Sequence, residues 1–175
     1  MKRDFASLSA QEALHVAIFI EERNADIYHQ LAEMFAEFRD PESLEIAAAF
    51  WEMSTEERNH GTILQKRYFE RYGTRPCSIT EEDIRDFIEV PKLESGELFS
   101  IKSAKGGRSP RFLALQIANQ AEQNALQFYT KLATASDDPE LRRLYQEFVS
   151  FESNHSDWLD RKLDEAQRSS DSKPA

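Results

Sequence analysis

Cysteine is almost absent from this sequence. Cys77 is the only one among 175 residues, so no disulfide can form within the chain. A single thiol also excludes an iron or zinc site built from cysteines alone within the chain. Unpaired cysteines are usual in reducing compartments, and we therefore expect a cytoplasmic protein.

Basic clusters and long hydrophobic runs are also lacking. The formal net charge is −10, whereas nucleic acids and anionic membranes are bound by clustered Lys and Arg. An apolar run such as residues 16–20 is far shorter than the ~20 residues that span a bilayer, and no apolar signal-peptide segment follows the first residues. We therefore expect neither a nucleic-acid partner nor a membrane partner.

Glycine and proline are few, with five and six residues, which permits long uninterrupted helices. Apolar residues make up 40% of the chain and recur at helical spacing in four stretches. A helix-start signal precedes each stretch: a capping box at Ser9 and Glu12, and a capping residue followed by proline at Asp40, Ser109 and Asp138. These signals predict helices over residues 10–38, 41–72, 109–135 and 139–167.

A long connection separates the second predicted helix from the third. Residues 73–108 show a weak helical pattern interrupted by proline and glycine, and they exceed what a turn between antiparallel neighbours needs. Within them, Thr80 stands at the start of a short helical pattern that extends through Phe87. The sequence thus predicts one all-α domain over residues 1–175, a four-helix bundle whose two helix pairs are joined by a crossover with a short extra helix.

Four glutamates and two histidines interrupt the apolar faces of these helices. The first and third helices carry one glutamate each, and the second and fourth carry Glu-x-x-His; the six residues are Glu21, Glu57, His60, Glu122, Glu152 and His155. Positions three apart lie on one helix face, so each Glu-x-x-His can offer a carboxylate and an imidazole to the same point. The second half of the chain repeats the first.

Burial of these carboxylates requires positive charge. Each ionised carboxylate in a dry core costs on the order of several kcal/mol, and together they rival the roughly 5–15 kcal/mol by which domains are stable. The inward faces offer no matching set of Lys or Arg, since Arg58 lies off the stripe. Two divalent cations would balance the four carboxylates, with the histidines as neutral ligands. The pattern therefore predicts a binuclear metal site.

The segments around the six residues resemble the rubrerythrin-like branch of the ferritin superfamily over nearly the whole chain. They are EERNADIYHQLAE (21–33), EERNH (56–60), EQNALQFY (122–129) and ESNH (152–155). The resemblance implies a ferritin-like fold. It also implies that Glu57 and Glu152 bridge the metals, that Glu21 and Glu122 are terminal ligands, and that His60 and His155 cap one metal each.

Two features depart from rubrerythrins proper. Those proteins carry a second glutamate one turn beyond the first on the third helix, where this chain has Ala125, with Asn119 on the other side. The carboxylate-for-histidine ligand exchange associated with peroxide turnover is therefore not implied here. Rubrerythrins also often carry a rubredoxin domain, which one cysteine cannot build, so the reductant would be a separate protein.

Tyr28 and Tyr129 lie two helical turns, about 10 Å, beyond Glu21 and Glu122. A buried hydroxyl needs a hydrogen-bond partner. One hypothesis is that each tyrosine donates to a ligand carboxylate across the bundle and orients it. The alternative is a bond to any nearby acceptor.

Other polar and apolar residues near these helices are interpreted as surface. His15 and His29 fall off the inward face, and Glu22, Glu33 and Glu56 are predicted to face solvent or pair with Arg. The outward aromatic residues Phe19, Phe38 and Phe69 are candidates for the interface of a homodimer.

A carboxylate-rich site with one imidazole per metal suits iron or manganese, and zinc would also bind. Two metals roughly 3.5–4 Å apart can bind a two-atom bridge such as peroxide or O2. The leading hypothesis is a di-iron oxidoreductase that reduces peroxide or oxidises Fe2+, with a role in oxidative stress. The alternatives are a non-enzymatic iron-binding or storage protein and a helical interaction module whose site is vestigial.

Overall fold

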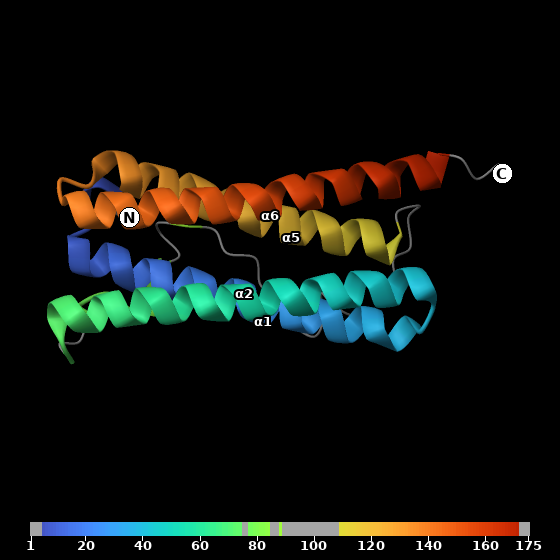
Figure 1. The fold of residues 1–175 in the computed structure, drawn as a ribbon, viewed down its shortest axis with the longest axis horizontal. Helices are drawn as coiled ribbons and strands as arrows, with labels where there is room; N and C mark the ends of the chain where they lie inside the picture. The colour runs from blue at the N-terminus through green and yellow to red at the C-terminus, as the bar shows by residue number, and fades with distance from the viewer. Residues whose placement is uncertain (1–4, 75–76, 85–87, 89–108, 172–175) are drawn as a thin grey trace.

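The computed structural model describes residues 5–74, 77–84, 88 and 109–171, and within them it is helical without strands. Four long helices form a bundle, α1 (Ala10–Phe38), α2 (Pro41–Tyr72), α5 (Pro110–Ala135) and α6 (Pro139–Asp171) (Figure 1). Two short elements accompany them, the 3-10 helix η1 (Phe5–Ser7) and the helix α3 (Glu81–Ile84). The bounds of α1 and α2 coincide with the predicted ranges, whereas α6 continues past its predicted end at residue 167.

The long helices begin at the capping signals seen in the sequence. Ser9 and Glu12 form a complete capping box before α1, each side chain accepting a hydrogen bond from the other residue's backbone N–H. Asp40 caps α2 by accepting from the backbone N–H of Ser43 at 2.9 Å. Arg39, with a left-handed φ of 60°, reverses the chain between α1 and α2. Local chemistry therefore sets where each hairpin turns.

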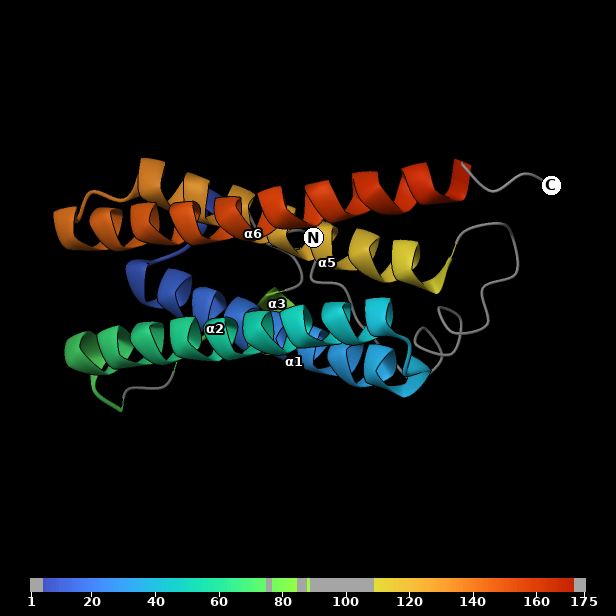
Figure 2. The ribbon, with the colours of Figure 1, turned by 45° about the vertical axis from the view of Figure 1, so that its right-hand side comes forward.

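The helices pair in the order of the sequence. α1 packs antiparallel to α2, and α5 packs antiparallel to α6, while α1 also contacts α5 (Figures 1 and 2). α2 ends at one end of the bundle and α5 begins at the other, as a crossover connection requires (Figure 1). Most of the predicted crossover, residues 73–108, lies outside the described residues. α3 corresponds to the start of its predicted short helix, and the stretch up to Phe87 lies outside them too.

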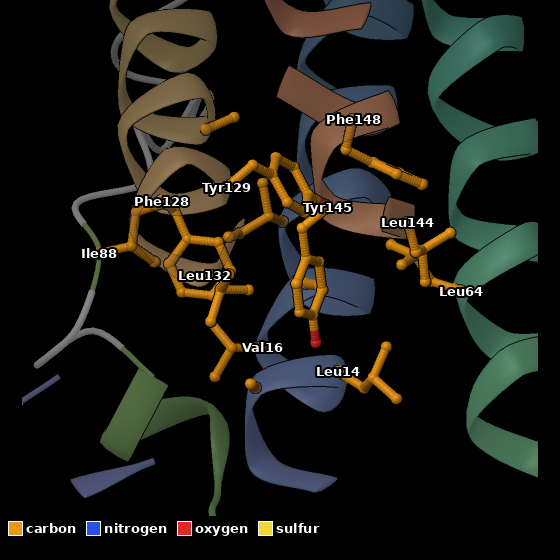
Figure 3. Packing of buried hydrophobic residues seen from close by; sticks show 14 of the residues in the cluster. Leu14, Val16, Leu64, Ile88, Phe128, Tyr129, Leu132, Leu144, Tyr145 and Phe148 are labelled. Atoms are coloured by element: carbon orange, nitrogen blue, oxygen red, sulfur yellow. The ribbon is translucent and has the colours of Figure 1, made fainter. Parts of the chain in front are cut away.

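Two apolar clusters fill the two ends of the bundle. In one of them, side chains from all four long helices meet, among them Leu14, Leu64, Phe128, Tyr145 and Phe148 (Figure 3). The other cluster includes Ile27, Phe35, Phe50, Leu115 and Leu159. In every long helix, the predicted ligands lie between the residues of one cluster and those of the other. The predicted ligands therefore lie between two apolar cores.

Some aromatic residues stay on the outer surface. Phe38 and Phe69 are 41% and 64% exposed. Phe19 is half-buried, and the guanidinium of Arg23 lies 5.7 Å from its ring centroid. The homodimer stays a prediction, for which Phe38 and Phe69 offer more free surface than Phe19. In the part of the chain that the structure describes, no helix combines the length and apolarity needed to cross a membrane.

Candidate metal centre

The six residues singled out in the sequence meet in the middle of the bundle. They form two groups, and within each group four ligand atoms all lie within 4.8 Å of one another. One group is Glu21, Glu57, His60 and Glu152, and the other is Glu57, Glu122, Glu152 and His155. Glu57 and Glu152 belong to both groups. Among the described residues, no other cluster of this kind occurs.

The centre is buried, and its polar atoms lack partners. All four glutamates are 0% exposed and His60 is 8% exposed. Among the described residues, eight of their atoms have no hydrogen-bond partner: Oε2 of Glu21 and Glu122, both carboxylate oxygens of Glu57 and Glu152, and Nδ1 of His60 and His155. Buried polar atoms are normally hydrogen-bonded, because each unsatisfied one costs about 1–3 kcal/mol and more if charged. Oxygen and nitrogen lone pairs that converge in this way fit metal cations.

Both imidazoles turn the same ring nitrogen toward the centre. Nδ1 of His60 lies 3.3 Å from Oε2 of Glu21 and 3.8 Å from Oε1 of Glu57. Nδ1 of His155 lies 3.0 Å from Oε1 of Glu57 and 3.5 Å from Oε2 of Glu122. The i,i+3 spacing on α2 and on α6 produces this matched orientation. Nδ1 is therefore the atom through which each histidine would bind a metal ion.

In the metal-free centre, the surroundings favour the protonated forms of Glu57, Glu152 and His155. Burial, followed by repulsion from neighbouring carboxylates, raises the pKa of Glu57 and of Glu152 well above the usual range. Although burial opposes it, the negative charge of the adjacent Glu122 and Glu57 carboxylates raises the pKa of His155 to about 11. Burial likewise opposes the lowered pKa of Glu122, which results chiefly from its close contacts with His155 and Glu152. A cation that enters must displace these protons.

Comparison with known proteins gives a family match and a similar fold. The family model described as Rubrerythrin matches residues 12–163. The chain belongs to the rubrerythrin family. The crystal structure of an uncharacterized conserved protein from Magnetospirillum magnetotacticum MS-1 is similar in fold, with a TM-score of 0.70 and 24% identity over 96% of this chain and 99% of that one. No curated protein matches the chain.

Membership of the rubrerythrin family supports a metal-binding role for the buried cluster. The four carboxylates and two imidazoles are buried in a ferritin-like fold, and the chain belongs to this family. Together these findings indicate a binuclear metal site. The third-helix position where rubrerythrins proper have a second glutamate is Ala125, which is fully buried in an apolar cluster. Asn119 instead donates to Asp160 at 2.7 Å and accepts from Ser156 at 3.3 Å. Within the described residues, neither position adds a fifth carboxylate.

The two tyrosines connect the halves of this rubrerythrin-family centre. The hydroxyl of Tyr28 on α1 donates to Oε1 of Glu122 on α5, and that of Tyr129 on α5 donates to Oε1 of Glu21 on α1. Burial, and then the nearby carboxylates, raise the pKa of both phenols, so they stay protonated and act as donors. Each bond leaves Oε2 of the same carboxylate facing the centre. The effect of these bonds on reactivity stays a prediction.

Replacing Tyr28 or Tyr129 with phenylalanine is expected to lower metal affinity by about tenfold, because a terminal carboxylate loses the bond that orients it. The ring stays buried, so the fold is retained. Competition with a coloured chelator measures the change. Tyr145→Phe is the matched control, since its buried hydroxyl has no hydrogen-bond partner among the described residues. Equal affinities in all three variants would show that the tyrosines only pack.

One contact near the ligands was missed from the sequence. Glu56 is exposed, as predicted, but its Oε2 also lies 2.8 Å from Nε2 of His155. Glu22 is exposed and accepts from Gln65 at 2.7 Å, while His29 lies 3.6 Å from the exposed Glu33. His15 is half-buried, with its ring centroid 6.3 Å from that of Tyr68. A comparison of the two Glu-x-x-His segments is the sequence signal that draws attention to Glu56. The residue before the glutamate is Glu56 in the first segment and Phe151 in the second.

Proposed function

We propose that this chain binds two iron ions and uses them to reduce hydrogen peroxide. The observation that supports this proposal most directly is the set of eight unpaired, buried ligand atoms in two overlapping groups. Glu57 and Glu152 would bridge the two ions, because each belongs to both groups. Glu21 and His60 would complete one metal position, and Glu122 and His155 the other.

Charge and donor type favour a pair of iron ions. Two divalent ions bring four positive charges, which balance the four carboxylates of the centre. Carboxylate oxygens with a single imidazole per ion are hard donors that suit iron or manganese. Zinc also binds such ligands, so a recombinant sample is expected to contain some zinc or manganese unless iron is supplied.

Peroxide matches the electron count of such a centre. Two ferrous ions held by these residues would supply one electron each, and hydrogen peroxide needs two electrons and two protons to give two molecules of water. Reduction of O2 to water would take four electrons. The protein's own part is to hold the ligands: Tyr28 and Tyr129 orient two terminal carboxylates, and the apolar clusters keep bulk water from both ends.

The reaction requires a partner that returns two electrons to the centre. We propose a separate one-electron donor protein for this role, since a single cysteine cannot build a rubredoxin-type iron site within the chain. A reducing compartment such as the cytoplasm suits both this donor and the free thiol of Cys77. Peroxide removal there would serve protection against oxidative stress.

Stopped-flow mixing tests the proposed reaction. Metal-free protein is loaded anaerobically with two Fe2+ per chain and mixed with H2O2 or with O2, while the ferric absorbance is followed. We expect one peroxide to oxidise two irons, at a rate at least about tenfold higher than with O2 at equal concentration. Faster oxidation by O2 would contradict peroxide reduction and favour a ferroxidase. Uptake of many irons per chain would favour a storage protein.

A further inference from the structure

The two metal positions have the same ligand types but differ in what lies behind each histidine. Glu56 and Phe151 occupy equivalent positions in the two repeats, each directly before a bridging glutamate. Glu56 on α2 contacts His155 on α6, with 2.8 Å between Oε2 and Nε2. Phe151 on α6 stacks on His60 of α2, with ring centroids 4.5 Å apart and planes 14° apart. A carboxylate supports one imidazole, and a phenyl ring supports the other.

This difference changes the two histidines as donors. A hydrogen bond from Nε2–H to a carboxylate fixes the tautomer, so that Nδ1 keeps its lone pair for the centre, and it raises the basicity of the ring. His155 has this support from Glu56. The ring of His60 instead stacks on Phe151, which restrains it without adding negative charge.

The remaining features of the two positions are matched. Each has a terminal glutamate whose Oε1 accepts from a tyrosine, and each shares Glu57 and Glu152. The His155 side also adjoins a cavity of about 280 Å³ between α2 and α6, lined in part by Glu56, His155 and Arg161. The side chain of Glu56 is 50% exposed, so it meets this cavity while it contacts His155. The outer partner of the histidine is thus the main difference between the positions.

We propose that Glu56 is a positioning residue which, through His155, makes the Glu122–His155 position the tighter of the two and the first to fill. This inference rests on the proposed binuclear site. It assigns different roles to two positions that the repeat makes similar. Support of this kind for a metal-binding histidine typically changes metal affinity by about 10–100-fold.

Stepwise metal binding tests the role of Glu56. In one experiment, metal-free protein is titrated with Co2+, whose visible absorption reports each binding step. In a second, the protein is loaded with 57Fe and studied by Mössbauer spectroscopy. In Glu56→Ala, the first Co2+ step is expected to weaken by about 10–100-fold, while the second keeps its affinity. Glu56→Gln should weaken the first Co2+ step less, because an amide oxygen still accepts a hydrogen bond. Only one of the two iron signals is expected to shift.

Glu52→Gln and Glu52→Ala are the matched controls. Glu52 is exposed and lines the same cavity, so these variants remove the same charge from the same wall. They are expected to bind Co2+ as the unaltered protein does. Equal weakening of both steps in the Glu56 variants, or the same weakening in the Glu52 variants, would overturn the proposal. An unaltered protein that binds no pair of metals would instead contradict the proposed function.

Discussion

Glutamine in place of Glu57 or Glu152 is expected to weaken binding of both metal ions, whereas in place of Glu21 or Glu122 it weakens only one. The reason is that Glu57 and Glu152 belong to both four-residue groups, and the other two glutamates belong to one group each. Glutamine keeps the volume of the side chain but removes its negative charge. Removing one partner of a buried ion pair costs roughly 3–5 kcal/mol, which corresponds to about 10²–10⁴-fold in affinity.

Metal analysis and chelator competition measure this difference directly. The bridging variants are expected to retain almost no metal after gel filtration, and the terminal variants about one ion per chain. Folding is checked separately by melting the metal-free proteins. Since burial raises the pKa of Glu57, the metal-free Glu57→Gln protein should melt no lower than the unaltered one at neutral pH. Loss of a single ion from the Glu57 and Glu152 variants would mean that these residues do not bridge.

The parts of this centre that could be predicted from sequence are those set by local geometry. The i,i+3 spacing places Glu57 beside His60 and Glu152 beside His155 on any helix, whatever the tertiary structure. Capping residues act over three or four positions, so the starts of α1 and α2 were equally visible. The end of α6 could not be predicted, because no glycine or proline stands between residue 167 and Asp171 to stop the helix.

The parts that could not be predicted depend on how distant helices face one another. The sequence left open whether each tyrosine would reach a ligand carboxylate across the bundle or another nearby acceptor. The packing of α1 on α5 decides this, since it pairs Tyr28 with Glu122 and Tyr129 with Glu21. Glu56 lies at the edge of its helix face, where periodicity does not separate a solvent contact from one to a neighbouring helix. Its contact with His155 joins α2 to α6.

Loading the centre with metal is expected to raise the melting temperature substantially. Free metal at about 1,000 times the dissociation constant adds about 4.1 kcal/mol of stability per site, so two sites add about 8 kcal/mol. For a chain of 175 residues this corresponds to roughly 15–30 °C. Calorimetry of metal-free and metal-loaded protein at neutral pH measures the shift. The Glu57→Gln protein, which lacks a bridging charge, should show little of it.

The stability of the metal-free protein is expected to depend on pH, and the pKa shifts give the direction of the change. The raised pKa values of Glu57 and Glu152 mean that the folded metal-free protein keeps protons which the unfolded chain releases above pH 4.5. His155 acts in the same direction, because its pKa rises from 6.5 to about 11 on folding. The folded state therefore binds more protons, and the stability of the metal-free protein should fall as the pH rises from 5 to about 9.

Metal replaces these protons and removes this dependence. The melting temperature of the loaded protein should therefore vary little with pH above the acid range, so the stabilisation by metal grows as the pH rises. Binding should also release protons, which calorimetric titration in buffers of different ionisation enthalpy counts. A metal-free protein that becomes more stable between pH 5 and 9, or metal binding without proton release, would show that the buried carboxylates are not neutralised by protons. The cluster would then need another source of positive charge, since its four carboxylates lie within two overlapping groups of ligand atoms.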